Sequence, residues 1–199
     1  MSSGHNSARE AKRKKILEEA IKEFVAKGFT GANINKIAEN SGIGKGTIYL
    51  YFKSKEDLYV EALNQSNKLW MEKAREIIDS NPDPYEALKE MLKVDIIVSV
   101  RRKELAQLWI NSFFADNKRF SETAAAVFEE YVKLIQDLVK ECIKKGIFRE
   151  VDPRTAAYVL LGLNELLIAF YEPLFKSKAS LDNITGTIQD MIFTGLEKK

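Results

Sequence analysis

Apolar residues recur every three or four positions along most of the chain. In the first long segment, Ile16, Ala20 and Phe24 lie four residues apart, which places them on one face of a helix. The same period returns from residue 84 to near the C-terminus. No segment shows the alternation of apolar and polar residues that is typical of a strand. The pattern therefore predicts an all-α protein of about nine helices.

Residues that favour helix ends separate these segments. Gly28 and Gly146 can take the left-handed conformation that ends a helix, and Pro82 and Pro84 interrupt the chain between two helices. Pro153 suits the first turn of a late helix. The expected helices cover residues 8–27, 34–41, 44–52, 55–78, 84–102, 104–115, 120–145, 153–171 and 181–196.

A short helix, a turn and a second short helix are predicted between residues 33 and 55. Asn33 is a favourable N-cap for the first helix, and Gly42 ends it. In the second helix, Ile48 and Phe52 lie four residues apart and are expected to face the interior. The residues left on its outer face are polar, aromatic or basic, namely Lys45, Thr47, Tyr49 and Tyr51. This arrangement is typical of a helix-turn-helix, whose second helix enters the major groove of DNA.

The segment GIGKGTIYLYFKSKEDL, from Gly42 to Leu58, resembles the DNA-binding signature of TetR-family transcriptional repressors. The similarity covers about residues 14–63. It implies an N-terminal DNA-binding head and a C-terminal helical body for ligand binding and dimerisation. We therefore expect a tail at residues 1–7, disordered or left from expression, a helix-turn-helix domain at 8–55, and the body at 56–199. The implied function is a repressor that a small, largely apolar effector releases from a palindromic operator on double-stranded DNA.

The resemblance also indicates which residues meet DNA. Lys45 is placed to reach a phosphate or a guanine edge, and Lys55 to reach a backbone phosphate. Asn35 stands where the family often has a base-reading arginine, and Leu50 where it often has a histidine or an aromatic residue. The expected DNA-binding residues are Asn35, Lys36, Lys45, Thr47, Tyr49, Tyr51 and Lys55.

The charge is divided unevenly along the chain. The formal net charge is only +2, but residues 8–55 contain eleven Lys or Arg against five Glu, and the remainder contains twenty against twenty-four acids. A basic N-terminal quarter on an acidic body indicates that one end meets a polyanion. Taken by themselves, the charges could equally form an ordinary solvated surface. Together with the helix-turn-helix, they favour DNA.

Residues 153–171 are the most apolar of the expected helices. From Ala156 to Tyr171 the only strongly polar residues are Asn164 and Glu165, so the segment lacks the polar stripe of a surface helix. We expect protein to bury it on nearly all sides, which in a chain of 199 residues requires a partner subunit. Residues 153–171 and 181–196 are therefore the expected homodimer interface, in agreement with the resemblance.

The aromatic residues of the body either fill its core or line an effector cavity. The candidate ligand-binding residues are Trp109, Phe113, Tyr131, Asn164 and Glu165, with Gln107 and Asn111 as further polar candidates and Asp95 as a weaker one. A buried carboxylate needs a partner. Glu165 therefore either bonds within the protein or meets a cationic or hydrogen-bond-donating effector.

Catalysis and cofactor binding find little support in the sequence. The only histidine is His5, so no histidine-based catalytic site or metal cluster is expected, and no cofactor is implied. The single cysteine, Cys142, lies on an apolar helical face and is expected to be a buried thiol in a reducing cytoplasm. No membrane-spanning segment is expected. An enzyme is not expected. The alternative that stays open is a DNA-binding regulator controlled by a protein partner, with no small-molecule pocket.

Overall fold

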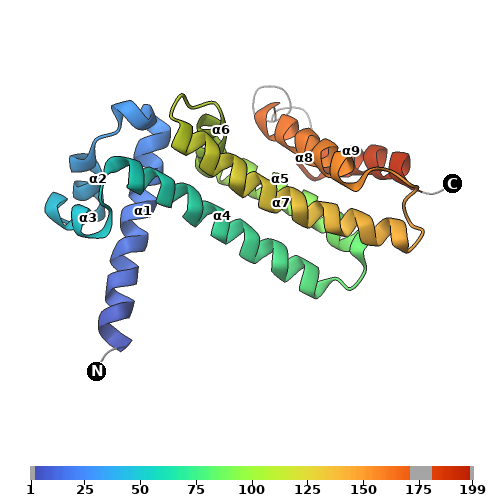
Figure 1. Cartoon of the computed structure of the whole chain (residues 1–199), viewed down its shortest axis with the longest axis horizontal. Helices are drawn as coiled ribbons and strands as arrows, with labels where there is room; N and C mark the ends of the chain where they lie inside the picture. The colour runs from blue at the N-terminus through green and yellow to red at the C-terminus, as the bar shows by residue number, and fades with distance from the viewer. Residues whose placement is uncertain (1–2, 171–180, 198–199) are drawn as a thin grey trace. The chain divides into compact units, whose positions relative to one another are not determined.

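The computed structural model describes residues 3–170 and 181–197, with the backbone alone described at residues 3–6, 103, 166–170 and 181–182. Nine α-helices and no strand occur in these ranges, which confirms the all-α fold (Figure 1). The helices are α1 (Ser3–Gly31), α2 (Ile34–Ser41), α3 (Lys45–Tyr51), α4 (Lys55–Ser80), α5 (Pro84–Arg101), α6 (Lys103–Phe113), α7 (Lys118–Lys144), α8 (Pro153–Phe170) and α9 (Leu181–Leu196).

The chain packs as two compact units. The head unit contains Met1–Leu69 and Glu104–Val127, and the body unit contains Trp70–Lys103 and Phe128–Lys199. Helices α4 and α7 each contribute residues to both units. The head unit thus includes α6 and the first turns of α7 in addition to the helix-turn-helix.

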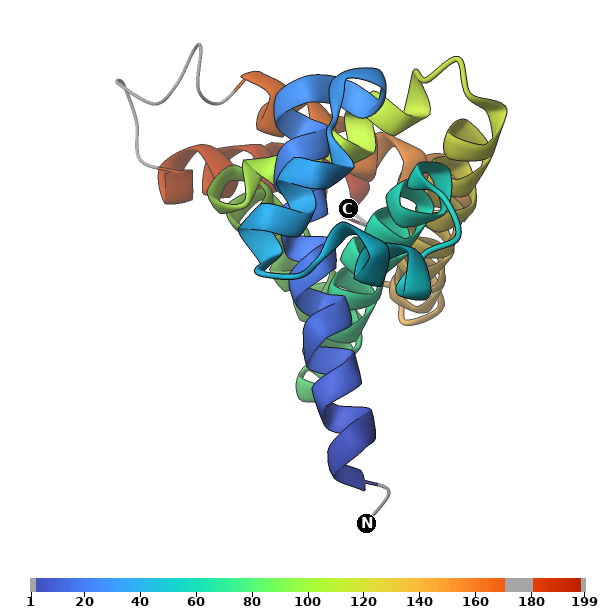
Figure 2. The same cartoon turned by 90° about the vertical axis from the view of Figure 1, so that its left-hand side faces the viewer.

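The core of the head unit lies where α1 contacts α2 and α2 contacts α3. In Figure 2 the ribbons of these helices, coloured blue to cyan, face the viewer. Its aliphatic centre includes Ile16, Leu17, Ile37 and Ile48. An aromatic cluster adjoins it: the ring centroids of Tyr59 and Phe120 are 4.3 Å apart, and those of Phe29 and Phe120 are 4.7 Å apart. The short helices α2 and α3 are therefore held by tertiary packing, since helices of this length are marginal alone.

Helix α1 is longer than the sequence pattern indicates. It begins at Ser3 rather than at residue 8, because a helix that is already nucleated extends at little cost. At Gly28, where the sequence predicts the end of the helix, the backbone leaves helical geometry, and one further turn follows to Gly31. The backbone of Gly28 has φ 66° and ψ 171°, and the N–H of Ala32 donates to its carbonyl oxygen at 3.1 Å. Gly28 therefore marks a kink, which only glycine adopts without strain.

The body unit has a second core, in which α5 contacts both α8 and α9. Leu88, Leu92, Val132, Val139 and Leu160 lie within it. Cys142 is buried there, as expected, and burial raises the pKa of its thiol to about 12. None of the helices within residues 3–170 and 181–197 combines the length and apolar character needed to cross a membrane.

Candidate functional site

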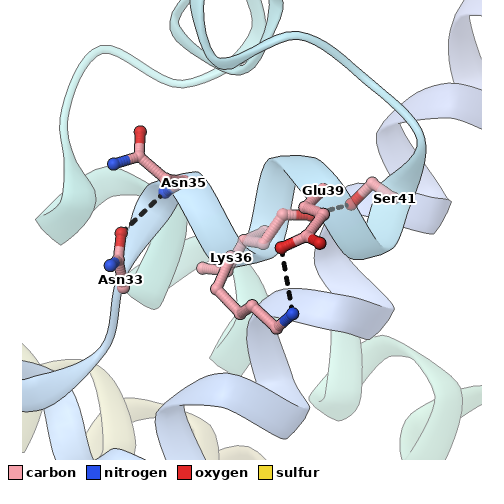
Figure 3. A network of polar contacts seen from close by, with 6 residues as sticks. Asn33, Asn35, Lys36, Glu39 and Ser41 are labelled. Atoms are coloured by element: carbon pink, nitrogen blue, oxygen red, sulfur yellow. Dashed lines mark hydrogen bonds and ion pairs between the residues drawn. The ribbon is translucent and has the colours of Figure 1, made fainter.

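Helix α2 is capped at both ends by its own sequence. The side chain of Asn33 accepts a hydrogen bond from the backbone N–H of Asn35 at 2.9 Å, as predicted for an N-cap (Figure 3). Near the other end, the Ser41 hydroxyl donates to the carbonyl oxygen of Ile37 at 2.5 Å. Ile34, Ile37 and Ala38 face the core, so Asn35 and Lys36 are left on the exposed side.

The turn between α2 and α3 depends on Gly42. Its φ of 66° is left-handed, and its N–H donates to the carbonyl oxygen of Glu39 at 3.0 Å. The N–H of Ile43 donates to the carbonyl oxygen of Ala38 at 2.9 Å. These two bonds form a Schellman motif, which satisfies the last carbonyls of α2 and redirects the chain into α3.

Helix α3 presents one face to the core and the other to solvent. Ile48 and the following Phe52 are buried, as the four-residue spacing predicts. Lys45 and Tyr49 are exposed on the outer side, Tyr49 by 45%, while Thr47 is half-buried. Leu50 is the most exposed large apolar residue of the helix, at 78%.

Tyr51 lies partly against the head core rather than fully outside. Its ring packs beside Phe52, with centroids 6.4 Å apart, and the guanidinium of Arg9 lies 5.8 Å from its ring centre. Arg13, one turn later on α1, lies 5.6 Å from the Phe52 ring and pairs with Glu61 of α4. The basic start of α1 is therefore attached beside α3, with Arg9 stacked on a proposed DNA-contacting residue.

Two of the expected lysine contacts already have protein partners. The Lys36 ammonium forms an exposed ion pair with Glu39 at 2.9 Å, as Figure 3 shows. The Lys55 ammonium donates to the carbonyl oxygen of Thr30 at 3.1 Å and lies 5.0 Å above the Phe29 ring. Exposed ion pairs are weak, so Lys36 can exchange its partner for a phosphate. Lys55 has a structural role at the end of α1 whatever else it contacts.

A second group of candidate residues meets in the body unit. The side-chain amide of Asn164 on α8 donates to Oδ2 of Asp95 on α5 at 3.0 Å and to the carbonyl oxygen of Leu92 at 3.1 Å. Asp95 is 7% exposed and Asn164 is 3% exposed. Burial raises the pKa of Asp95 to about 6, while the hydrogen bond from Asn164 acts in the opposite direction.

Tyr131 and Glu165 belong to the same polar cluster. Burial raises the pKa of the Tyr131 hydroxyl, and the negative charges of Asp95 and Glu165 raise it further. The pKa of Glu165 is also raised, first by surrounding protein atoms and then by Asp95. Glu165 is exposed in the single chain, so its own protomer leaves this side of α8 uncovered. The expectation that a partner subunit covers the helix stays a prediction.

Trp109 and Phe113 belong to α6, in the head unit. The indole N–H of Trp109 donates to the hydroxyl of Ser66 on α4 at 3.0 Å, and the rings of Trp109 and Phe113 are 6.2 Å apart. Gln107 and Asn111, the further polar candidates on α6, bond to each other at 3.0 Å. Tyr131, Asn164 and Glu165 thus all interact with Asp95 in the body unit, whereas Trp109, Phe113, Gln107 and Asn111 belong to the head unit.

Asp95, the weaker candidate from the sequence, is a buried acid of the body cluster. It follows Leu88 and Leu92 along the apolar face of α5, and Ile96 comes next to it. An acid on an apolar helical face is a signal of a buried polar group. The sequence therefore contained a signal for Asp95. The partner of Asp95, Asn164, is 69 residues away, and no local pattern identifies such a pair.

Two protein-family models match the chain. Residues 16–62 match the model described as bacterial regulatory proteins, tetR family, which contains the helix-turn-helix. Residues 81–196 match the model described as the Tetracyclin repressor-like C-terminal domain. The second match alone spans more than half of the chain.

Related proteins agree with these models. The chain is 29% identical over 192 residues to the HTH-type transcriptional regulator YhgD of Bacillus subtilis (strain 168), covering 93% of this chain and 96% of that protein. It is 28% identical over 152 residues to the HTH-type transcriptional repressor NicS of Pseudomonas putida, covering 75% and 72%. These relatives are transcriptional regulators, in agreement with the expectation that the chain is not an enzyme.

Among solved structures, the transcriptional regulator FadR from Bacillus subtilis, in complex with stearoyl-CoA, superposes with a TM-score of 0.81. The sequence identity is 20%, and the match covers 92% of this chain and 99% of that one. At this identity the similarity establishes the fold.

Proposed function

The chain belongs to the TetR family of bacterial regulatory proteins, and from this premise we propose that it is a homodimeric repressor released from a palindromic operator by a small effector. We assign DNA binding to residues 8–55 and effector binding and dimerisation to residues 56–199. The DNA-binding residues that we propose are Asn35, Lys36, Lys45, Thr47, Tyr49, Tyr51 and Lys55.

The observation that carries the proposal is that the outer face of α3 is exposed and bears basic and aromatic side chains. The Schellman turn at Gly42 and the buried Ile48 orient this seven-residue helix so that Lys45, Tyr49 and Leu50 face solvent. Ammonium and phenol groups on an exposed helix suit phosphates and base edges in a major groove. The neighbouring start of α1 adds Arg9 and further lysines to the same basic end of the chain.

Apolar side chains exposed on α8 and α9 support a homodimer. Val159 is 53% exposed in the single chain, and Leu163 and Met191 are also exposed. Gly162 has no atom within 4 Å of the position that a Cβ would occupy, so the helix surface is open there. Where exposed apolar side chains form a patch, the patch typically marks a protein interface. A second copy covering α8 and α9 would create the two-fold symmetry that a palindromic operator mirrors, with half-sites about 34–36 Å apart.

The polar cluster of the body supports an effector that is largely apolar but carries a hydrogen-bond-donating or cationic group. Asp95, Tyr131, Asn164 and Glu165 come from three helices, and two of them are carboxylic acids. A donor placed beside these acids would compensate their charge. This part of the proposal rests on the body residues; Trp109 and Phe113 remain proposed contacts from α6.

The experiment for the DNA claim is selection from a random duplex library with the purified full-length chain. Sequencing of the bound fraction should reveal a palindromic motif, whereas an unenriched library would contradict the proposal. The effector claim is tested separately by thermal denaturation with hexyltrimethylammonium and with hexanesulfonate. We expect the cation to raise the melting temperature more than the anion. Equal effects would favour the alternative of a regulator controlled by a protein partner.

A further inference from the structure

Leu50 occupies an unusual position on α3. Successive residues of a helix are about 100° apart around its axis, so Gly46 and Leu50 both lie about 160° from the buried Ile48. They form the ridge of the helix that points farthest from the core, and Thr47 and Tyr49 lie on either side of it. At 78% exposure, Leu50 projects into solvent from the centre of the proposed DNA-binding face.

The fold does not account for this leucine. Ile43 and Tyr51 pack against the head core, but Leu50 is not part of that packing. A single exposed leucine is common on protein surfaces and needs no explanation by itself. Here, however, it belongs to a helix-turn-helix segment in which Lys36, Lys45 and Lys53 are also exposed, and such a basic segment suits a polyanion.

Gly46 provides a second observation on the same ridge. No atom lies within 4 Å of the position that its Cβ would take, and its φ is not left-handed. Neither packing nor backbone conformation therefore requires glycine, although glycine is less favourable than alanine inside a helix. Its absent side chain leaves the helix surface flat one turn before Leu50, so that a flat partner can approach the backbone there.

We propose that Leu50 reads thymine methyl groups in the major groove of the operator, and that Gly46 permits the close approach this contact needs. Thymine is the only base of B-DNA that presents a methyl group in that groove, and apolar side chains contact it. A leucine cannot hydrogen-bond to the other base edges, so its contribution to recognition is confined to this group. The inference rests on the proposed DNA-binding function and adds the sequence feature that the helix selects.

The test uses the duplex enriched by selection with the full-length chain. Each thymine of a half-site is replaced in turn by 2′-deoxyuridine, which removes the methyl group and keeps base pairing. For the wild-type chain we expect at least one replacement to weaken binding by about fourfold, the effect of one buried methyl group. For Leu50→Ala the same replacement should change the affinity by less than about twofold, because the contact is already absent.

Leu69→Ala is the matched control, since Leu69 is an exposed leucine of the head unit that lies outside the helix-turn-helix. It should bind as tightly as the wild type and remain sensitive to methyl removal. Thermal denaturation followed by circular dichroism should give Leu50→Ala and the wild type the same melting temperature. A loss of affinity then cannot be explained by a loss of fold. Gly46→Ala should keep or raise the melting temperature and still weaken operator binding.

The outcomes separate this inference from the function on which it rests. Enrichment of a motif whose binding is insensitive to every methyl removal would overturn the role of Leu50. Equal sensitivity of Leu50→Ala and the wild type would overturn it as well. If no duplex is enriched, the proposed function itself fails, and the inference fails with it.

Discussion

The side-chain amide of Asn164 donates a hydrogen bond to Oδ2 of Asp95 at 3.0 Å, and both residues are buried. This bond joins α8 to α5 within the body unit and compensates only part of the cost of a buried carboxylate. The negative charge of Asp95 also contributes to the raised pKa of the Tyr131 hydroxyl and of the Glu165 carboxyl. The ionisation of Asp95 is therefore linked to the stability of the body.

We expect Asp95→Asn to stabilise the chain at neutral and higher pH. The pKa of Asp95 in the folded chain is about 6, above the value of about 3.9 for an unfolded chain, so the folded state holds the proton more tightly. The contribution of Asp95 to the free energy of unfolding thus falls as pH rises from about 4 to about 6. Asparagine removes the charge and keeps an acceptor for Asn164. Relative to the wild type, its free energy of unfolding should be higher by about 2 kcal/mol at pH 8 and similar at pH 4.

Urea denaturation followed by circular dichroism at both pH values measures this difference. Asp79→Asn is the control, because Asp79 is exposed on α4 in the same unit. The control should show no comparable change with pH. If Asp95→Asn is less stable than the wild type at pH 8, the ionised carboxylate must have a favourable partner, and the account of the cluster is wrong.

Lys45 and Lys55 should differ in how their replacement acts. Lys55→Ala removes the hydrogen bond to Thr30 and the contact with Phe29, so it should lower the free energy of unfolding by about 1 kcal/mol in addition to weakening DNA binding. Lys45→Ala should leave stability unchanged and cost roughly 1–3 kcal/mol of operator affinity if it reads a base. Denaturation and anisotropy titrations on operator and random duplexes separate these effects. Equal losses on both duplexes would assign Lys45 to a phosphate.

A charge on the exposed face of α8 should disrupt the proposed dimer. Val159→Glu places a carboxylate where we expect a second copy to exclude water. At micromolar concentration, light scattering should give the wild type a molecular mass of twice 22.7 kDa, that of a dimer. It should give the variant a mass of 22.7 kDa, that of a monomer. Ala126→Glu, on the exposed side of α7, should stay dimeric. A wild-type chain that is monomeric under these conditions would contradict the proposed interface.

Glu165→Gln tests the effector proposal in the body. Glu165 is exposed in the single chain, so the substitution should keep both the fold and the affinity for the selected duplex. Release of the duplex by a cationic effector should require a higher concentration, because one of the two acids is lost. The measurement is anisotropy of the labelled duplex during titration with hexyltrimethylammonium. An unchanged release curve with an altered melting temperature would assign Glu165 to structure.

Local signals in the sequence predicted the helix-turn-helix well. Asn33 and Gly42 act at the ends of α2 as expected, since caps depend on neighbouring backbone groups. The spacing of Ile48 and Phe52 identified the buried side of α3 for the same reason. Gly28 interrupts helical geometry as expected, but the further turn that ends at Gly31 was not predicted.

The body cluster was only partly predictable. The composition of α8 singled out Asn164 and Glu165, but it could not show that one is buried and the other exposed in a single chain. Which side of α8 meets α5 is decided by contacts between segments about 70 residues apart. The hydrogen bond between Trp109 and Ser66 of α4 also joins distant segments, 43 residues apart.

Equilibrium binding of the full-length chain to the selected duplex, at 50 mM and 200 mM salt, tests the central claim most directly. The basic start of α1 and the outer face of α3 should displace several counterions, so the affinity should fall by about a hundredfold or more between these concentrations. A duplex of scrambled sequence should bind more weakly than the selected duplex at both salt concentrations. Absence of binding at 50 mM salt, or equal affinity for the two duplexes, would contradict the assignment of this chain as a sequence-specific DNA-binding regulator.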